Sequence, residues 1–217
     1  METKNIITIL IADDQPIARA GIQQLLSKAK DFEIVGEARD GFETLKRVSQ
    51  LRPRVLLLDI KMPGPRSFEI EKWIRENIPE TVTLVLTSHD HDAYLASMID
   101  AGAVGYLTKE ESANRLINAI RQAAIGIIYF NEEQIDRMQR WKHEVKEKWE
   151  KLSIREREVL RILKLGKDNK TIAESLSVSI KTVEFHMTNI LKKLTLNSRD
   201  EAIVWMHENS VGDLDIS

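Results

Sequence analysis

The sequence has 217 residues, of which 42% are hydrophobic and 30% charged, and its formal net charge is −2. This composition excludes a disordered chain, a collagen-like fibre and a membrane-spanning protein. The absence of cysteine excludes disulfide frameworks and cysteine–zinc sites. No signal-peptide pattern opens the sequence, so we expect a cytoplasmic protein that does not bind membranes.

Short apolar runs alternate with amphipathic segments in the first half of the chain. The runs predict five strands, at residues 6–12, 33–38, 55–58, 82–86 and 104–107. The amphipathic segments predict five helices, at residues 16–29, 42–51, 67–77, 92–101 and 112–125. Strands that are apolar on both faces and separated by helices are typical of a parallel sheet covered on both sides. The expected fold class is therefore α/β, a (βα)5 unit with a parallel five-stranded sheet.

The second half is helical in pattern and carries more positive charge. Residues 151–200 contain 11 basic and 6 acidic residues, which favours a polyanionic partner. The pattern predicts helices at residues 132–150, 154–165, 169–176, 180–194 and 199–208. Four of these helices are preceded by residues suited to cap free backbone amides: Ser153, Asp168, Ser179 and Ser198. We expect a smaller all-α domain here.

The segment between the two halves has its own pattern. It contains neither glycine nor proline, and its apolar residues recur at spacings of three or four: Ile135, Met138, Trp141, Val145, Trp149 and Leu152. We predict a continuous linker helix from Glu132 to Glu150 whose apolar stripe packs on either domain or on a partner subunit. The alternative is a fraying, charged tether.

Polar side chains follow four of the five predicted strands. Asp13 and Asp14 follow the first strand, Asp59 the third, Thr87 the fourth and Lys109 the fifth. Because the carboxyl ends of parallel strands meet at one edge of a sheet, these groups should converge. Three close carboxylates repel one another unless they hold a hard cation such as Mg²⁺, and a lysine and a hydroxyl opposite it could bind a phosphoryl group. The alternative is that polar residues merely end these strands.

Four motifs carry a resemblance to the receiver domain of two-component response regulators. They are Ile-Ala-Asp-Asp at 11–14, Leu-Leu-Asp-Ile-Lys-Met-Pro-Gly at 57–64, Leu-Thr-Ser at 86–88 and Ala-Gly-Ala-Val-Gly-Tyr-Leu-Thr-Lys at 101–109. The resemblance implies a flavodoxin-like receiver in which Asp59 accepts a phosphoryl group. It also implies that Asp14, Asp59 and the main-chain carbonyl of Lys61 bind Mg²⁺, with Asp13 acting through water.

The same resemblance assigns three further residues. Lys109 would pair with phosphoryl oxygens, and Thr87 would be the switch hydroxyl. Movement of Thr87 would let Tyr106 turn inward and change the surface around the fourth helix and fifth strand. The alternative for Tyr106 is a half-buried packing aromatic.

The segment from about Asn169 to Thr188 fits a helix-turn-helix, with the second helix suited to the major groove of DNA. The segments 152–160, 169–173 and 182–194 resemble the LuxR-type output domain, so the whole chain resembles a NarL/FixJ-type response regulator. The resemblance places four residues in the groove and three near phosphates: Lys181, Thr182, Glu184 and Phe185, then Asn189, Lys192 and Lys193. Glu184, where lysine is common, could accept from cytosine N4 or could be a solvated glutamate.

These resemblances predict a receiver at residues 1–127, a helical linker at 128–150 and a DNA-binding domain at 151–217. The expected function is a transcriptional regulator that a sensor histidine kinase phosphorylates on Asp59. It would bind double-stranded promoter DNA, act as a homodimer when phosphorylated, and catalyse only its own phosphorylation and dephosphorylation. The alternative is a phosphorylation-independent regulator whose receiver serves dimerisation. A dehalogenase-like phosphatase would need a second aspartate at position 61, which is lysine. A flavodoxin-like cofactor binder would need a phosphate-cradling loop after the first strand, where this chain is acidic.

Overall fold

The computed structural model describes residues 6–209 and divides into two compact units. One unit contains the residues up to Asp90 together with Ser97–Ile135, and the other contains His91–Ala96 and the residues from Asp136 onward. Within the described part of the chain, no helix combines the length and the apolar character that crossing a membrane requires.

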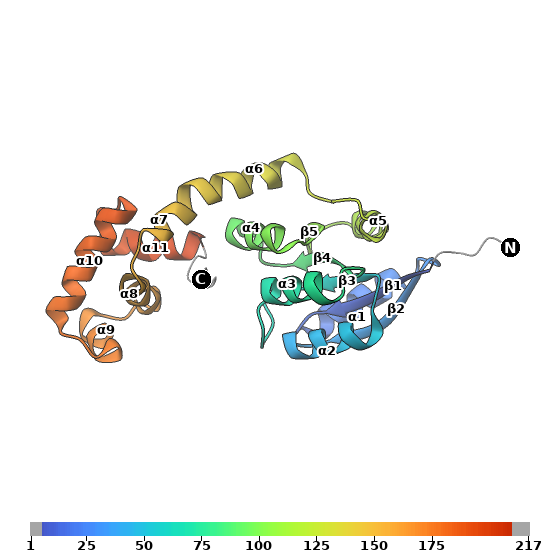
Figure 1. The fold of residues 1–217 in the computed structure, drawn as a ribbon, viewed down its shortest axis with the longest axis horizontal. Coiled ribbons are helices and arrows are strands. Elements are labelled where there is room, and N and C mark those ends of the chain that lie inside the picture. The colour runs from blue at the N-terminus through green and yellow to red at the C-terminus, as the bar shows by residue number, and fades with distance from the viewer. Residues whose placement is uncertain (1–5, 210–217) are drawn as a thin grey trace. The chain divides into compact units, whose positions relative to one another are not determined.

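The first unit is built on a five-stranded parallel sheet (Figure 1). Its strands are β1 (Ile7–Ala12), β2 (Phe32–Ala38), β3 (Val55–Leu58), β4 (Val82–Thr87) and β5 (Gly105–Thr108). They lie in the order β2-β1-β3-β4-β5, and every pair in the sheet is parallel. All residues of β3 and β4 are buried, as expected for strands with helices on both faces. The predicted α/β class is confirmed.

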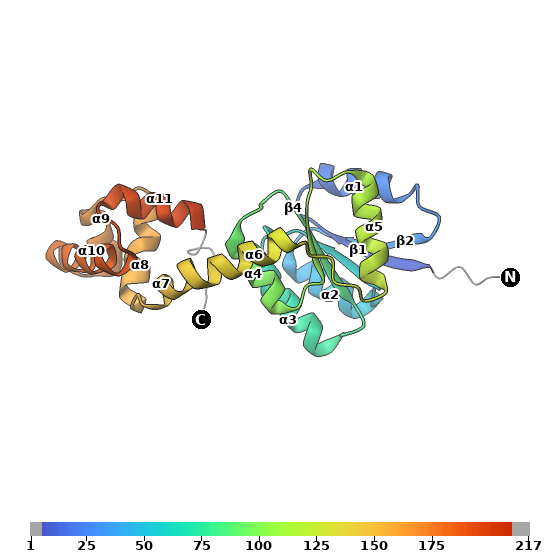
Figure 2. The same cartoon turned by 90° about the horizontal axis from the view of Figure 1, so that it is seen from above.

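Helices cover both faces of this sheet. They are α1 (Pro16–Leu26), α2 (Gly41–Leu51), α3 (Ser67–Asn77), α4 (Asp92–Ala101) and α5 (Ala113–Ala124). Helices α1 and α5 lie on one face, and α2, α3 and the C-terminal half of α4 lie on the other (Figure 2). The core under α1 and α5 contains Ile9, Leu57, Leu84, Leu116 and Ile120, all at most 4% exposed. Because helices cover both faces of the sheet, a functional site is expected at the carboxyl ends of its strands.

Element boundaries agree with the sequence patterns to within a few residues. Helix α1 ends three residues earlier than predicted because Ala29 N–H bonds to Leu26 O in a turn that leads into β2. Strand β5 begins at Gly105, one residue later than predicted, although Val104 already bonds through its N–H to Thr83 O.

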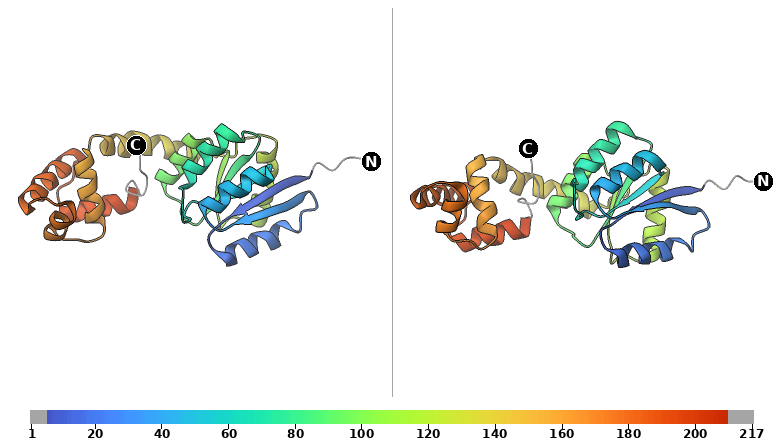
Figure 3. Two further views of the ribbon diagram at one scale, coloured as in Figure 1. Left: turned by 60° about the horizontal axis from the view of Figure 1, so that its bottom comes forward. Right: turned by 90° about the horizontal axis from the view of Figure 1, so that it is seen from below.

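The second unit contains the bundle α8 (Ile154–Lys164), α9 (Asn169–Leu176), α10 (Ile180–Leu194) and α11 (Arg199–Asn209). These helices, coloured orange to red, pack together around one core (Figure 3). The caps form as predicted: the side chains of Ser153, Asp168, Ser179 and Ser198 each accept a backbone N–H from the first turn of the helix that follows. A short turn between α9 and α10 completes the helix-turn-helix.

The helix-turn-helix consists of α9 and α10, which contain the predicted segment from about Asn169 to Thr188. It begins at Asn169 as predicted, but Thr188 lies inside α10, which continues to Leu194. The helix continues because Ile190 and Leu194 prolong its buried face, and it ends where Thr195 adopts a left-handed conformation with φ of 60°. Helix α10 therefore has the bounds, residues 180–194, that the sequence predicts for this helix.

The linker is helical from Glu132 to Glu150, but it is not a regular α-helix throughout. It consists of α6 (Glu132–Trp141), the π-helical segment η1 (Lys142–Lys146) and α7 (Glu147–Glu150). Trp141, Val145 and Trp149 are buried, so the predicted stripe is packed. A four-residue spacing advances about 40° beyond a full α-helical turn. The wider turn of η1 offsets this drift and keeps the buried side chains on one face.

The carboxyl group of Glu71, on α3, is completely buried in the first unit. Its Oε1 lies 2.9 Å from Arg75 Nε. Burial raises the pKa of Glu71 to about 7, against the opposing effects of the neighbouring Thr83 and Arg75 side chains. The folded state therefore holds a proton that the unfolded chain releases above the ordinary pKa of 4.5. Stability from this group is full below that value and falls as the pH rises through 7.

We expect Glu71→Gln, which keeps an acceptor for Arg75, to remove this pH dependence. Between about pH 5 and pH 8 the wild type should lose about 2–3 kcal/mol of unfolding free energy relative to the variant. Hydrogen exchange of the sheet amides, measured in urea at several pH values, tests this difference. Parallel pH profiles for the two proteins would show that Glu71 does not titrate in this range.

Candidate functional site

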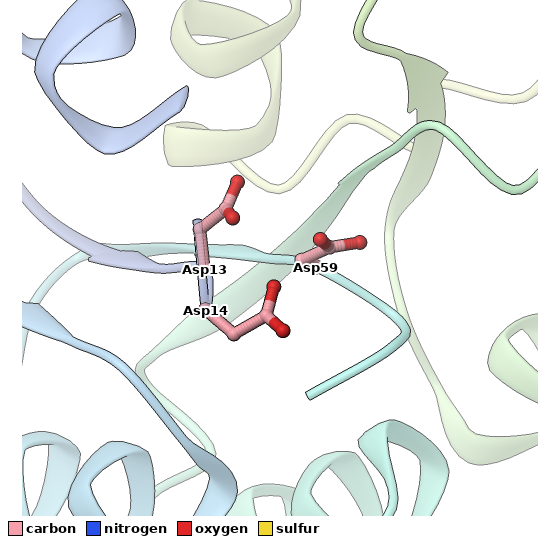
Figure 4. Close-up of side chains that lie close together, drawn as sticks. All are labelled: Asp13, Asp14 and Asp59. Carbon is pink, nitrogen blue, oxygen red and sulfur yellow. The ribbon is translucent and has the colours of Figure 1, made fainter. Parts of the chain in front are cut away.

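Three carboxylates meet at the carboxyl edge of the sheet (Figure 4). Asp13 and Asp14 follow β1, and Asp59 follows β3. One oxygen atom from each residue lies within 4.8 Å of the others. Asp13 and Asp59 are buried, whereas Asp14 is exposed. The cluster offers only hard oxygen donors and is open on one side, which suits Mg²⁺ with several retained waters.

Lys109, the first residue after β5, supplies the countercharge. Its Nζ lies 2.6 Å from Asp13 Oδ2 and 2.8 Å from Asp59 Oδ2. Burial opposes the charge of the ammonium, but hydrogen bonds and attraction from Asp13 and Asp59 outweigh it and raise the pKa of Lys109. A positively charged Lys109 is therefore fixed beside Asp59, the residue that the sequence predicts as phosphoacceptor.

Backbone and neighbouring hydrogen bonds hold these side chains in place. Asp59 Oδ1 accepts from Ile60 N–H at 2.7 Å, and Asp13 Oδ1 accepts from Gln15 N–H at 2.9 Å. Lys109 N–H donates to Thr87 O at 2.9 Å, which joins the ends of β5 and β4. Both carboxylates thus keep one oxygen fixed by the backbone and direct the other toward Lys109.

Thr87 and Tyr106, the two predicted switch residues, are both buried. Thr87 Oγ1 accepts from His89 N–H at 3.1 Å. The Tyr106 hydroxyl donates to His89 O at 2.6 Å, and the residue is 1% exposed. The sequence predicted an inward turn of Tyr106, and in this structure the ring already lies inside. Lys61 lies in the loop after β3 and is exposed, and its carbonyl as a metal ligand stays a prediction.

Helix α10 divides its side chains as the helix-turn-helix prediction requires. Val183, Met187, Ile190 and Leu194 are buried in the bundle. Of the residues predicted to contact DNA, five are exposed and two are half-buried: Lys181, Glu184, Phe185, Lys192 and Lys193, then Thr182 and Asn189. Phe185 is 64% exposed.

Thr188, the last residue of the predicted motif, lies on the exposed side of α10. Its hydroxyl donates to Glu184 O, one turn earlier in the helix, at 3.0 Å. That bond satisfies the hydroxyl within the helix itself. Thr188 therefore lies on the exposed face within α10.

Lys193 and Thr182 have partners inside the second unit. Lys193 Nζ lies 2.7 Å from Glu156 Oε2, and Glu156 Oε2 also accepts from Ser153 N–H. Burial acts against the charge of Glu156, but Lys193 and Ser153 together lower its pKa. Thr182 Oγ1 lies 2.8 Å from Ser179 Oγ. Their contacts with DNA stay predictions, and Lys193 additionally fastens α10 to the start of α8.

The sequence pattern does not single out Gln134, which contacts β5 in the structure. Its side-chain Nε2 donates to Tyr106 O at 2.9 Å. The pattern Asn131-x-x-Gln134 fits the capping signature and could have shown that a helix begins here. No sequence pattern indicates the contact with a backbone atom of β5.

Comparison with known proteins agrees with this geometry in both units. The profile of the response regulator receiver domain matches residues 9–121. The profile of the bacterial regulatory proteins of the luxR family matches residues 150–206. The first match covers the acidic cluster, and the second covers the helix-turn-helix.

Relatives of known name match nearly the whole chain. The oxygen regulatory protein NreC of Staphylococcus epidermidis is 37% identical over 209 residues, which cover 90% of this chain and 94% of NreC. The nitrate/nitrite response regulator NarL of Escherichia coli K12 is 33% identical over 97% of this chain and all of NarL. A solved structure of RcsB dimers bound to DNA has a TM-score of 0.61, with 26% identity over 94% of this chain and 99% of RcsB. Two matched domains in this order, with relatives that share both, place the chain in the NarL-type response regulators, in which a receiver domain precedes a LuxR-type DNA-binding domain.

Proposed function

We propose that the chain is a phosphorylation-switched transcriptional regulator that accepts a phosphoryl group on Asp59 from a sensor histidine kinase. The observation that carries this proposal is the cluster of Asp13, Asp14 and Asp59, in which Asp13 and Asp59 both contact the ammonium of Lys109. A carboxylate oxygen of Asp59 would attack the phosphorus atom, and the bond from phosphorus to its leaving group would break. The product is an acyl phosphate on Asp59.

Negative charge on both reactants opposes this attack, and the site contains the groups that offset it. Lys109 can pair with a phosphoryl oxygen once Asp59 has reacted. Asp14, Asp59 and the carbonyl of Lys61 would hold Mg²⁺, with Asp13 acting through water. When bound, Mg²⁺ supplies electrostatic stabilisation of the phosphoryl oxygens. Self-phosphorylation and loss of the phosphate are the only reactions we propose for the chain.

The proposed target is double-stranded promoter DNA. The luxR-family match, the exposed face of α10 and the similarity to DNA-bound RcsB support this partner. The RcsB structure contains dimers, and we propose that phosphorylation likewise promotes a homodimer of this chain on paired half-sites. Because promoter DNA is the proposed partner, we place the protein in the cytoplasm.

Selection of DNA fragments by the full chain, with and without beryllofluoride and Mg²⁺, tests the proposal. We expect one enriched sequence whose affinity changes when beryllofluoride occupies the Asp59 site. An enriched sequence that binds equally in both conditions would favour a phosphorylation-independent regulator. No enrichment in either condition would contradict a role in promoter recognition.

Two substitutions on α10 distinguish phosphate contacts from base contacts. Lys192→Ala should weaken binding to all sequences. It should also reduce the magnitude of the slope of log affinity against log salt concentration by about 1, the contribution of one phosphate contact. Glu184→Lys should instead change the preferred base in the selected sequence. A salt slope unchanged in Lys192→Ala would exclude Lys192 as a phosphate contact. An unchanged selected site in Glu184→Lys would show that Glu184 does not read bases.

A further inference from the structure

The first turn of α6 is capped by a reciprocal pair of hydrogen bonds. Gln134 N–H donates to Asn131 Oδ1 at 2.8 Å, and Asn131 N–H donates to Gln134 Oε1 at 3.1 Å. This pair satisfies two backbone amides that a helix start leaves free. The Oε1 atom of Gln134 is thereby engaged inside the linker helix, while Nε2 of the same amide points to a different element.

That second atom contacts the switch strand. Gln134 Nε2 donates to Tyr106 O at 2.9 Å, and Tyr106 lies in β5. The Tyr106 hydroxyl donates to His89 O, and His89 N–H donates to Thr87 Oγ1. Three hydrogen bonds therefore connect four residues in turn, from the Thr87 hydroxyl through His89 and Tyr106 to the capping amide of Gln134.

Gln134 lies close to the boundary between the two compact units. The division between the two compact units falls between Ile135 and Asp136, within α6. Upstream, Tyr129 N–H donates to Val104 O and forms a parallel bridge with Gly105, so the preceding segment lies along the edge of β5. Gln134 thus makes a contact within the receiver unit two residues before the chain enters the other unit at Asp136.

A cleft beside the contact leaves room for it to change. Its volume is about 200 Å³, and Tyr106, Phe130, Asn131 and Gln134 are among the residues that line it. Packed interiors resist small displacements, whereas a side chain at the wall of a cleft can exchange its partner without moving a core. A rearrangement of β5 would therefore displace the Tyr106 carbonyl, and the Gln134 side chain has room to move with it.

We propose that Gln134 is a positioning residue that ties the start of the linker helix to the switch strand and so couples the state of Asp59 to the DNA-binding domain. This inference rests on the proposed function, because it concerns how phosphorylation reaches DNA binding. When Thr87 moves toward a phosphoryl group on Asp59, His89 loses its acceptor. Tyr106 and its carbonyl then shift, and Gln134 carries that shift into α6.

The chemistry of the amide supplies a sharp set of variants. Gln134→Glu keeps the oxygen that accepts from Asn131, and its negative charge suits a helix N-terminus. It cannot donate to Tyr106 O, however, because an ionised carboxylate only accepts. Gln134→Ala loses both interactions. A helix-capping role and a coupling role therefore predict opposite results for Gln134→Glu.

Three readouts on the full chain separate the possible roles. They are labelling of Asp59 by acetyl phosphate, hydrogen exchange of the first turns of α6, and the ratio of DNA affinities with and without beryllofluoride. In both variants we expect normal labelling and faster exchange around Gln134. The affinity ratio should fall by about three- to tenfold, the size expected for one lost hydrogen bond.

Tyr106→Phe adds an independent check. It removes the hydroxyl bond to His89 but keeps the Tyr106 carbonyl that Gln134 contacts. If the hydrogen bonds act in series, combining Tyr106→Phe with Gln134→Glu should reduce the affinity ratio less than the two separate effects added together. Additive effects would overturn the proposal.

Other outcomes are equally decisive. A wild-type affinity ratio in Gln134→Glu, together with a loss in Gln134→Ala, would reduce Gln134 to a helix cap and overturn the proposal. If Asp59 of the wild type takes up no phosphate, the proposed function is wrong, whatever the role of Gln134. The exchange comparison between the wild type and Gln134→Glu then still decides whether Gln134 holds the helix to β5.

Discussion

Asp59→Asn is expected to abolish acid-labile phosphate on the protein after incubation with acetyl phosphate and Mg²⁺. An amide oxygen is a poor nucleophile and cannot form the acyl phosphate, whereas a carboxylate oxygen of Asp59 lies 2.8 Å from the ammonium of Lys109. The substitution also removes one of the three carboxylates of the acidic cluster. The change in DNA affinity caused by beryllofluoride should disappear as well.

The matched control is Asp200→Asn, an exposed position on α11. Intact-protein mass measurement should show one added phosphate in the wild type and the control, and none in Asp59→Asn. Lys109→Ala should keep part of the labelling but lose the DNA response, because the phosphoryl group no longer pairs with an ammonium. One phosphate on Asp59→Asn would place the phosphoacceptor elsewhere.

Trp149→Ala should destabilise the second unit by about 3–5 kcal/mol, the usual cost of removing a large aromatic side chain from a core. Trp149 is fully buried. Its ring stacks on Trp205 of α11 with centroids 6.5 Å apart, and Arg157 of α8 lies over it at 5.4 Å. Small domains have unfolding free energies of about 5–15 kcal/mol, so this loss should also impair DNA binding.

Trp149→Phe is the matched variant, since it keeps an aromatic ring in the same space and should cost less. Urea unfolding of the second unit, followed by hydrogen exchange in α8, α10 and α11, gives the difference. An unfolding free energy unchanged by Trp149→Ala would show that the end of the linker helix behaves as a flexible tether, contrary to its packing here.

The sheet could be predicted because burial leaves a direct trace in the sequence. The run Val55–Leu58 is apolar throughout, and the structure gives the same boundaries. The helices α9 and α10 were also bounded correctly, since Asp168 and Ser179 are strong capping residues. The end of α1 was wrong because its last predicted turn continues the same amphipathic pattern while the backbone already turns toward β2.

The acidic cluster could be predicted because parallel topology alone brings the strand ends together. Other polar contacts could not be predicted from the sequence. Glu156 and Lys193 are 37 residues apart, and nothing in either helix indicates their pairing. Glu71 occupies a fully buried position on an otherwise ordinary amphipathic helix. Gln134 contacts a backbone oxygen, and a backbone oxygen has no sequence identity that a pattern could reveal.

The wide turn η1 has a consequence for the length of the linker. Trp141 and Trp149 are eight residues apart, and in a regular α-helix they would differ by about 80° in direction. Residues seven apart differ by only about 20°. The wider π-helical turn at Lys142–Lys146 therefore accommodates one residue more than a regular α-helix would need between two side chains on the same face. If one residue of this segment is deleted, it can become a regular α-helix in which Trp141 and Trp149 still face the same side. If one residue is inserted, this helix contains no second wide turn that would restore the common direction of the two tryptophans.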